Sequence, residues 1–148
     1  MNSPNDPLKF ERLTILDTPD WQDVRFLDDR LYEFNAAATG ISDGRLMAIF
    51  LRDGHNDIIA GLYGWTWGQC CEVKTLWVHE DWRGKGLGTR LMSAAEQEAR
   101  LRGATQMVLS THSFQAPEFY RRLGFEIVGY NPDYPIGHQL IFLRKRLE

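Results

Sequence analysis

A glycine-rich segment between an apolar stretch and an amphipathic one constrains this chain of 148 residues more than any other feature. The segment runs from Val78 to Thr89 and carries glycine at positions 84, 86 and 88. Apolar residues at helical spacing follow it as far as Leu101, so the pattern predicts a strand, a tight turn and a helix. The first N–H groups of that helix have no intrahelical partner and lie at the positive end of its dipole. The segment therefore predicts a backbone cradle for phosphate oxygens.

The side chains around the turn fit the same interpretation. Glycine has no Cβ atom to hold a pyrophosphate away from the backbone, and Arg83 and Lys85 add positive charge. Two other nucleotide motifs do not fit. The chain contains no G-x-x-x-x-G-K-[ST] string, and a G-x-G-x-x-G fingerprint that starts at Gly84 would need glycine where Thr89 stands. A Walker loop and a dinucleotide-binding turn are therefore excluded.

Two strings carry a family resemblance. Arg83, Gly86 and Gly88 form an R-x-x-G-x-G string that resembles the pyrophosphate loop of the GNAT superfamily of N-acetyltransferases. Residues 116–125 resemble the other signature of that family, a short helix ending in Y-x-x-x-G-F, with Tyr120 as its tyrosine. The strings stand in the expected order, and the resemblance covers about residues 44 to 146.

The composition sets broad limits on the class of protein. A chain of this length is expected to form one domain, 1–148, with a single core that needs neither metal nor disulfide. The net charge is −3, so the sequence does not predict a basic surface that would bind nucleic acid. Cys70 and Cys71 are adjacent, so no disulfide between them is expected, and reduced thiols suit the cytoplasm. Without a long apolar run, neither a signal peptide nor a membrane partner is expected.

Apolar spacing and turn residues predict the order of the elements. We expect a strand over 9–17, a helix that starts at Thr18-Pro19-Asp20 with Pro19 in its first position, and strands over 45–52 and 57–64. A turn containing residues 65–68 leads to a strand over 70–79, then a helix over 86–102 and a strand over 106–110. The chain ends with a helix over 114–123 and strands over 125–130 and 138–145.

This order predicts an α/β protein with a mixed sheet, antiparallel at its start and parallel where the crossover helix returns. The resemblance implies the GNAT acyl-CoA N-acyltransferase fold, a central mixed sheet with flanking helices. In that fold two adjacent parallel strands splay apart, and here they would be those at 70–79 and 105–111.

The resemblance also implies acetyl-CoA as co-substrate, without a metal. Backbone groups of Leu76, Trp77 and Val78 would pair with the amides of the pantetheine arm like an added strand. The residues expected to hold the pyrophosphate are Arg83, Gly84, Lys85, Gly86, Leu87, Gly88 and Thr89. Ser113 replaces the asparagine usual in the family, and its hydroxyl can still hydrogen-bond with a shorter reach.

Acetyl transfer to an amine needs a proton acceptor for the amine and a proton donor for the departing thiolate. Tyr120 matches the tyrosine of the family whose hydroxyl lies near the cofactor sulfur, and N–H groups beside Val78 would polarise the thioester carbonyl. Glu72 is the favoured base, because its placement four residues before Leu76 matches the glutamate of some family members. His112 is the second choice, and many relatives use a water chain.

Each catalytic assignment has a structural alternative. Tyr120 could be a packed aromatic residue, Glu72 a solvated strand carboxylate, and His112 a structural side chain. The acceptor pocket is expected to use Tyr32, Phe34, Trp65, Trp67 and His112. The aromatic residues among them could equally cap the core. The loop 133–138 is expected to close over the acceptor.

The sequence therefore predicts a CoA-dependent N-acetyltransferase that acts by direct transfer to a primary amine in a ternary complex. A small-molecule amine is the favoured acceptor, and a polyamine, an aminoglycoside-like drug, an amino acid and a peptide terminus all stay open. Two alternatives belong to other classes: a non-catalytic acyl-CoA sensing module, and a structural or oligomerisation domain. Family members often dimerise, but no interface is predicted.

Overall fold

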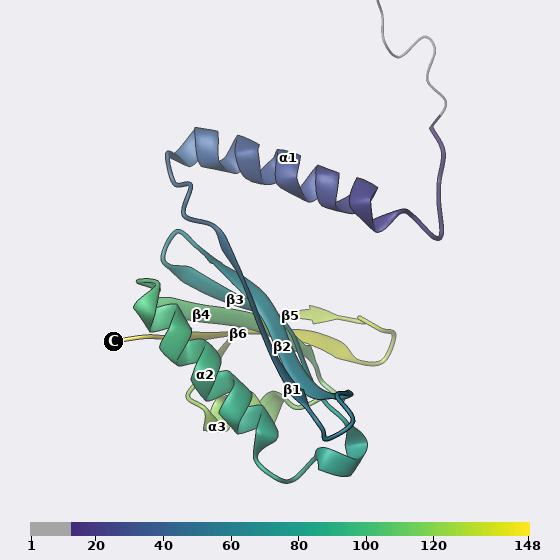
Figure 1. Ribbon diagram of the computed structural model, residues 1–148, viewed down its shortest axis with the longest axis vertical. Coiled ribbons are helices and arrows are strands. Elements are labelled where there is room, and N and C mark those ends of the chain that lie inside the picture. The colour runs from purple at the N-terminus through teal and green to yellow at the C-terminus, as the bar shows by residue number, and fades with distance from the viewer. Residues whose placement is uncertain (1–12) are drawn as a thin grey trace, which may run out of the picture. The chain divides into compact units, whose positions relative to one another are not determined.

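The structure is a computed structural model that describes residues 13–148. The chain divides into two compact units, residues up to Thr39 and residues 40–148. The first unit contains helix α1, Trp21–Thr39, and the second contains the sheet and the other helices (Figure 1). The expectation of one domain over 1–148 stays a prediction. No helix in the described part of the chain is long and apolar enough to cross a membrane.

The second unit is a six-stranded mixed sheet in the order β1-β2-β3-β4-β6-β5. β3 and β4 pair in parallel, whereas the other neighbours pair antiparallel, which confirms the predicted mixed sheet. In chain order its elements are β1 Arg45–Arg52, β2 Ile58–Trp67, β3 Cys70–Val78, the 3₁₀ turn η2 Glu80–Trp82, α2 Leu87–Leu101, β4 Gln106–His112, α3 Pro117–Arg122, β5 Glu126–Pro132 and β6 Gln139–Arg146.

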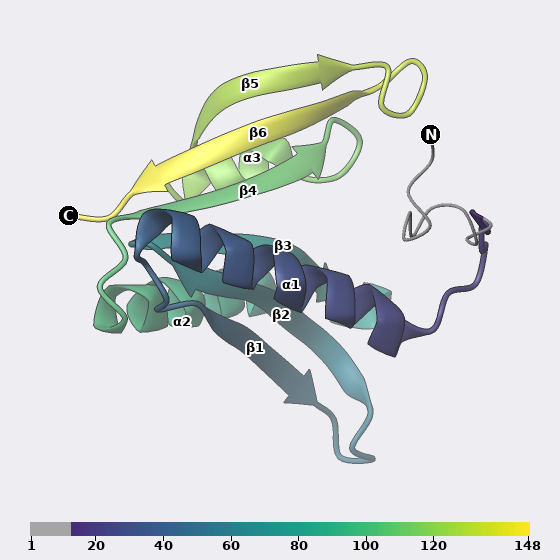
Figure 2. The same ribbon diagram turned by 90° about the horizontal axis from the view of Figure 1, so that it is seen from above.

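Helices α2 and α3 cover the same face of this sheet, as both views show (Figures 1 and 2). α2 buries Leu91, Met92, Ala95 and Ala99 at helical spacing. The largest fully buried side chains of the sheet are Leu62, Met107, Leu143 and Cys71. Burial of each large apolar side chain contributes roughly 1.5–3 kcal/mol, so this single core holds the helix against the strands.

A β-bulge in β3 shapes the sheet next to the site. Tyr63 pairs with Thr75 and Gly64 pairs with Val73, which leaves Lys74 as the extra residue. A Cβ atom on Gly64 would lie 2.0 Å from the carbonyl oxygen of Glu72, so only glycine fits opposite the bulge. A bulge increases the local twist of the sheet, and here it falls just where β3 leaves β4.

The parallel strands β3 and β4 separate after four paired positions. Their pairing runs from Cys70–Gln106 to Val73–Leu109 and then stops. Beyond that point β3 continues beside β2 as far as Val78, and β4 continues beside β6 as far as His112. Figure 2 shows the two strands diverging toward their ends. The expected splay is thus confirmed.

The N-terminal expectations were partly wrong. Residues 13–17 form no strand, and residues 9–12 lie outside the described residues. An alternating pattern makes a stable strand only when another strand pairs with it. The helix begins at Trp21 instead of Pro19, because the Asp20 side chain accepts a hydrogen bond from the N–H of Gln22 at 2.8 Å and caps the first turn.

The expected turn at residues 65–68 was also wrong. β2 continues to Trp67, and the two-residue turn is Gly68-Gln69, with φ of 56° and 65°. Trp-Thr-Trp is a run of strong strand formers, so the hairpin extends until the positive-φ residues end it. The remaining strands and helices lie within a few residues of their predicted bounds.

Candidate active site

A cavity of about 990 Å³ opens where β3 and β4 separate. It reaches from the glycine-rich loop before α2 to the end of β4 and to α3. Its lining consists of residues 73–78, 82–84, 86–89, 109–112, 114–116, Phe119, Tyr120 and Leu140. Most of the residues expected around a cofactor are therefore brought together by the splay.

The N-terminus of α2 presents backbone N–H groups without helical partners to this cavity. Gly86 is the N-cap, with φ 80° and ψ 9°, and no side chain caps the helix. The first hydrogen bond of the helix joins the N–H of Arg90 to the carbonyl of Gly86, so the N–H groups of Leu87, Gly88 and Thr89 have no such partner. Glycine is needed at 86 for its left-handed backbone. The loop thus fits a pyrophosphate.

For Gly88 the structure gives a different reason from the expected one. A Cβ atom on Gly88 would lie 3.2 Å from Cζ of Phe119 on α3. The absence of a side chain at this position therefore lets an aromatic ring approach the helix, whereas we had expected it to admit a phosphate.

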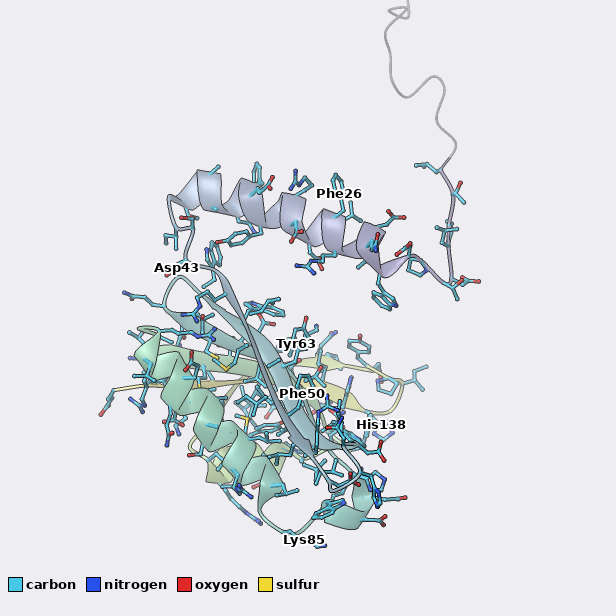
Figure 3. All side chains as sticks on the ribbon, in the orientation of Figure 1. Phe26, Asp43, Phe50, Tyr63, Lys85 and His138 are labelled. Atoms are coloured by element: carbon cyan, nitrogen blue, oxygen red, sulfur yellow. The ribbon has the colours of Figure 1, made fainter. Side chains whose placement is uncertain are left out.

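The two basic residues of the loop behave differently. Arg83 lines the cavity, and its Nε donates a hydrogen bond to the carbonyl of Val78 at 3.0 Å, which fixes the guanidinium at the end of β3. Lys85, labelled in Figure 3, is absent from the cavity lining. Its Nζ lies 4.8 Å from the centre of the Trp82 ring, a cation–π contact. Of these two loop residues, Arg83 is thus the one that the structure brings to the cavity.

The edge of β3 that faces the separation is free of strand partners. From Thr75 to Val78 this strand pairs only with β2, because its pairing with β4 ends at Val73. Backbone groups of Leu76, Trp77 and Val78 therefore have an open side toward the cavity that they line. Such an edge fits the amides of a pantetheine arm, as an added strand would pair.

Tyr120 lies on α3 and is only 9% exposed. Its ring packs edge-on against Phe119 and Phe125, at centroid distances of 5.1 and 6.0 Å. Tyr120 lines the cavity, and its hydroxyl forms no hydrogen bond with any residue in 13–148. Burial raises the pKa of Tyr120 above the ordinary 10.0, so the phenol stays protonated at neutral pH. The hydroxyl is therefore available as a proton donor.

His112 ends β4 and also lines the cavity. Its Nδ1 lies 2.9 Å from the carbonyl oxygen of Tyr134 in the loop between β5 and β6. The imidazole stacks on the Phe114 ring at 5.2 Å, with 9° between the planes. His138 of the same loop, labelled in Figure 3, contacts the Phe114 ring edge-on at 4.9 Å. The loop 133–138 is thus in contact with the end of β4.

Ser113 does not line the cavity. Its hydroxyl accepts a hydrogen bond from the N–H of Gln139 at 3.0 Å, and its own N–H donates to the carbonyl of Gln139. These two hydrogen bonds connect the start of β6 to the end of β4. Gln115 does line the cavity, and its Oε1 accepts from the N–H of His112 at 2.7 Å. The structure therefore does not bring Ser113 to the position expected for a cofactor contact.

Three of the other expected residues lie outside the lining of this cavity. Glu72 is half-buried on β3, beside Trp65 of β2, and neither residue nor Trp67 belongs to the cavity lining. Tyr32 and Phe34 lie on α1, in the other unit, so their place in an acceptor pocket stays a prediction.

Several lining residues were missed by the sequence reasoning. They are Lys74, Thr75, Ser110, Thr111, Phe114, Gln115, Ala116 and Phe119, among others. The run 113–116 joins a strand of the splayed pair to the helix that bears Tyr120, and that position was the available signal.

Comparison with known proteins identifies the family. The sequence profile of the Acetyltransferase (GNAT) family matches residues 10–125. The chain belongs to this family. It is 33% identical over 130 residues to an acetyltransferase of Agrobacterium fabrum, across 88% of this chain and 95% of the relative. As a GNAT protein it is an acetyl-CoA-dependent acetyltransferase.

Two further relatives of this GNAT protein are informative. The blasticidin-S acetyltransferase of Streptomyces morookaense is 40% identical over 92 residues, which cover 62% of this chain and 68% of that enzyme. The crystal structure of a candidate acetyltransferase from Agrobacterium tumefaciens matches with a TM-score of 0.80 at 31% identity, and covers 93% of this chain and 100% of that one. The predicted fold is thus confirmed.

Proposed function

We propose that this GNAT protein transfers the acetyl group of acetyl-CoA to a primary amine of a small molecule, by direct transfer within a ternary complex. One observation carries the proposal: a single cavity joins the free N–H groups in the first turn of α2 to Tyr120 and His112. The phosphates of the co-substrate and the reacting groups would therefore occupy one continuous space.

Direct transfer is favoured over an acyl-enzyme by the placement of the cysteines. Cys70 and Cys71 lie on β3 outside the cavity lining. Burial, together with the neighbouring Cys70 and Glu72, raises the pKa of Cys71 to about 11 despite the lowering effect of Arg102. A thiol with such a pKa is protonated at neutral pH and is a poor nucleophile.

The residues of the cavity have separate roles in this proposal. The loop 83–89 would hold the pyrophosphate, and the open edge of β3 would hold the pantetheine amides and polarise the thioester carbonyl. The Tyr120 hydroxyl would protonate the departing sulfur. A small acceptor is supported by the similarity to an enzyme that acetylates blasticidin S.

Thiol release from acetyl-CoA, measured across a panel of amines with calorimetric binding of acetyl-CoA to the same protein, tests the proposal. The panel would include blasticidin S, free amino acids, a polyamine, an aminoglycoside and a peptide with a free N-terminus. Release that depends on one of the small amines is the expected result. Binding without release from any amine would favour a sensing module, and absence of binding would favour a structural domain.

A further inference from the structure

We propose that His112 is the general base of the transfer, acting through Nε2, with its tautomer fixed by the backbone carbonyl of Tyr134. This inference rests on the proposed acetyl transfer to an amine. It assigns the base to the end of β4 in place of Glu72, which does not line the cavity.

The tautomer follows from the partner of the ring. A carbonyl oxygen carries no hydrogen, so the 2.9 Å contact between Nδ1 of His112 and the Tyr134 oxygen requires the proton on Nδ1. A neutral imidazole with Nδ1 protonated carries its lone pair on Nε2. Nε2 has no hydrogen-bond partner among residues 13–148, and His112 is part of the cavity lining. The structure thus leaves a basic nitrogen free beside the cavity.

The orientation of the ring is held from two sides. Phe114 stacks on the imidazole face at 5.2 Å, and the Tyr134 ring meets it edge-on at 5.2 Å. The N–H of His112 donates to Oε1 of Gln115, which fixes its backbone. A base that is already oriented loses little conformational freedom when it accepts a proton.

Hydrogen bonds within the loop 133–138 stabilise the conformation that presents the Tyr134 carbonyl to His112. The Asp133 carboxylate accepts from the N–H of Gly137 at 3.2 Å, and His138 donates its N–H to the carbonyl of Pro135 at 2.9 Å. The hydrogen bonds between Gln139 and Ser113 then join the end of the loop to the end of β4. The Asp133–His138 loop thus positions the base, a different role from the acceptor closure that the sequence predicted.

The proton balance of the step is complete with these groups. Nε2 takes one proton from the ammonium form of the acceptor and passes it to solvent. The free amine attacks the thioester carbonyl, the C–N bond forms, and the C–S bond breaks as Tyr120 gives its hydroxyl proton to the sulfur. The nitrogen of the new amide returns a proton to Tyr120. The titratable and charged groups around His112 are Tyr134 and His138 of the loop, with Lys74, Arg83 and Tyr120 in the cavity lining.

The first test is the pH profile of kcat/KM for the wild type and for His112→Gln. The substitution is expected to lower kcat/KM by about 100-fold and to remove the acid limb of the profile, because the group that accepts the proton from the amine is gone. Acetyl-CoA affinity, measured by calorimetry, should stay within about threefold. The matched control is His55→Gln in the turn between β1 and β2, which lies outside the cavity lining and should keep the wild-type profile.

Two further readouts separate a base from a structural histidine. Exogenous imidazole should restore part of the activity of His112→Ala in a concentration-dependent way. In the ¹⁵N-edited NMR spectrum of the wild type above pH 8, the imidazole resonances missing from His112→Gln should show a protonated Nδ1 and a bare Nε2.

The outcomes distinguish this inference from the proposed function. An acid limb that survives in His112→Gln and disappears in Glu72→Gln would overturn the inference while the acetyl transfer stands. A proton on Nε2, or no imidazole rescue, would overturn it as well. A wild type whose thiol release is not increased by any amine would overturn both.

Discussion

Gly88 of α2 and Phe119 of α3 approach so closely that a Cβ atom on Gly88 would lie 3.2 Å from Cζ of the Phe119 ring. The contact joins the first turn of the helix that presents free N–H groups to the short helix that bears Tyr120. The absence of a side chain at Gly88 therefore allows the helix of the proposed phosphate site to pack closely against the helix that bears the proposed proton donor.

Gly88→Ala is expected to weaken acetyl-CoA binding several-fold, because the Phe119 ring must move by a few tenths of an ångström at the wall of the cavity. The free energy of unfolding should change by less than about 1 kcal/mol, since alanine in a helix regains about 0.5–1 kcal/mol relative to glycine. Calorimetric titration and denaturant unfolding measure the two effects.

Gly54→Ala is the matched control for that variant. A Cβ atom at position 54 would meet nothing within 4 Å, and the residue lies outside the lining of the cavity. Both affinity and stability should match the wild type. Equal acetyl-CoA affinity in Gly88→Ala and Gly54→Ala would show that the Gly88–Phe119 contact does not shape the cofactor site.

Tyr120→Phe is expected to lower kcat by about 100-fold with little change in acetyl-CoA affinity, because it removes a proton donor and keeps the ring. Burial raises the pKa of Tyr120 above 10.0, and only the protonated phenol donates. Activity should therefore fall only as the pH rises through that elevated pKa, and this basic limb should be missing in the variant. Pre-steady-state thiol release across pH checks both points. An unchanged kcat would remove Tyr120 from the mechanism.

The sequence predicts features that depend on neighbouring residues more accurately than features that depend on contacts between distant segments. The bounds of β1 and the start of α2 follow from nearby apolar spacing and glycines, and both were predicted to within a residue. The prediction that Trp65 and Trp67 lie in a turn was wrong because the end of β2 is set by the residues with positive φ. Those residues are Gly68 and Gln69, and the apolar pattern does not identify them.

The site depends more on contacts between distant segments. His112 and Tyr134 lie 22 residues apart, and their contact arises from the pairing of β4 with β6, which no local pattern contains. The side of the sheet that Glu72 faces depends likewise on the bulge at Lys74. Sequence reasoning therefore found both histidine and glutamate as candidates but could not decide which of them lines the cavity.

Gly64→Ala is expected to lower the free energy of unfolding by about 3 kcal/mol, near the upper end of ordinary overpacking. The new methyl group would lie 2.0 Å from the carbonyl oxygen of Glu72, and backbone cannot move aside as a flexible side chain can. Thermal and denaturant unfolding measure the loss, with Gly54→Ala as the control for a harmless methyl group. A wild-type midpoint would mean that the bulge adapts without cost.

Glu96 should make stability depend on pH in the acid range. Its carboxylate lies 2.6 Å from Nζ of Lys145 on β6 and 2.9 Å from a guanidinium nitrogen of Arg100 on α2. Burial by itself would raise the pKa of Glu96, but the hydrogen bonds from Lys145 and Arg100 outweigh it and bring the pKa below 4.5. A carboxyl whose pKa is lowered on folding stabilises the fold above its unfolded pKa, and that contribution disappears as the pH falls through the folded value.

Glu96→Gln is therefore expected to cost about 0.5–1 kcal/mol at pH 7, and the difference from the wild type should shrink steadily below pH 4.5. Denaturant unfolding at a series of pH values measures this. Glu126→Gln is the control, because the Glu126–Arg144 pair is more exposed and should contribute less. If the Glu96→Gln deficit were the same at pH 3 as at pH 7, it would come from lost packing at position 96, and the ion pair between α2 and β6 would contribute nothing to stability.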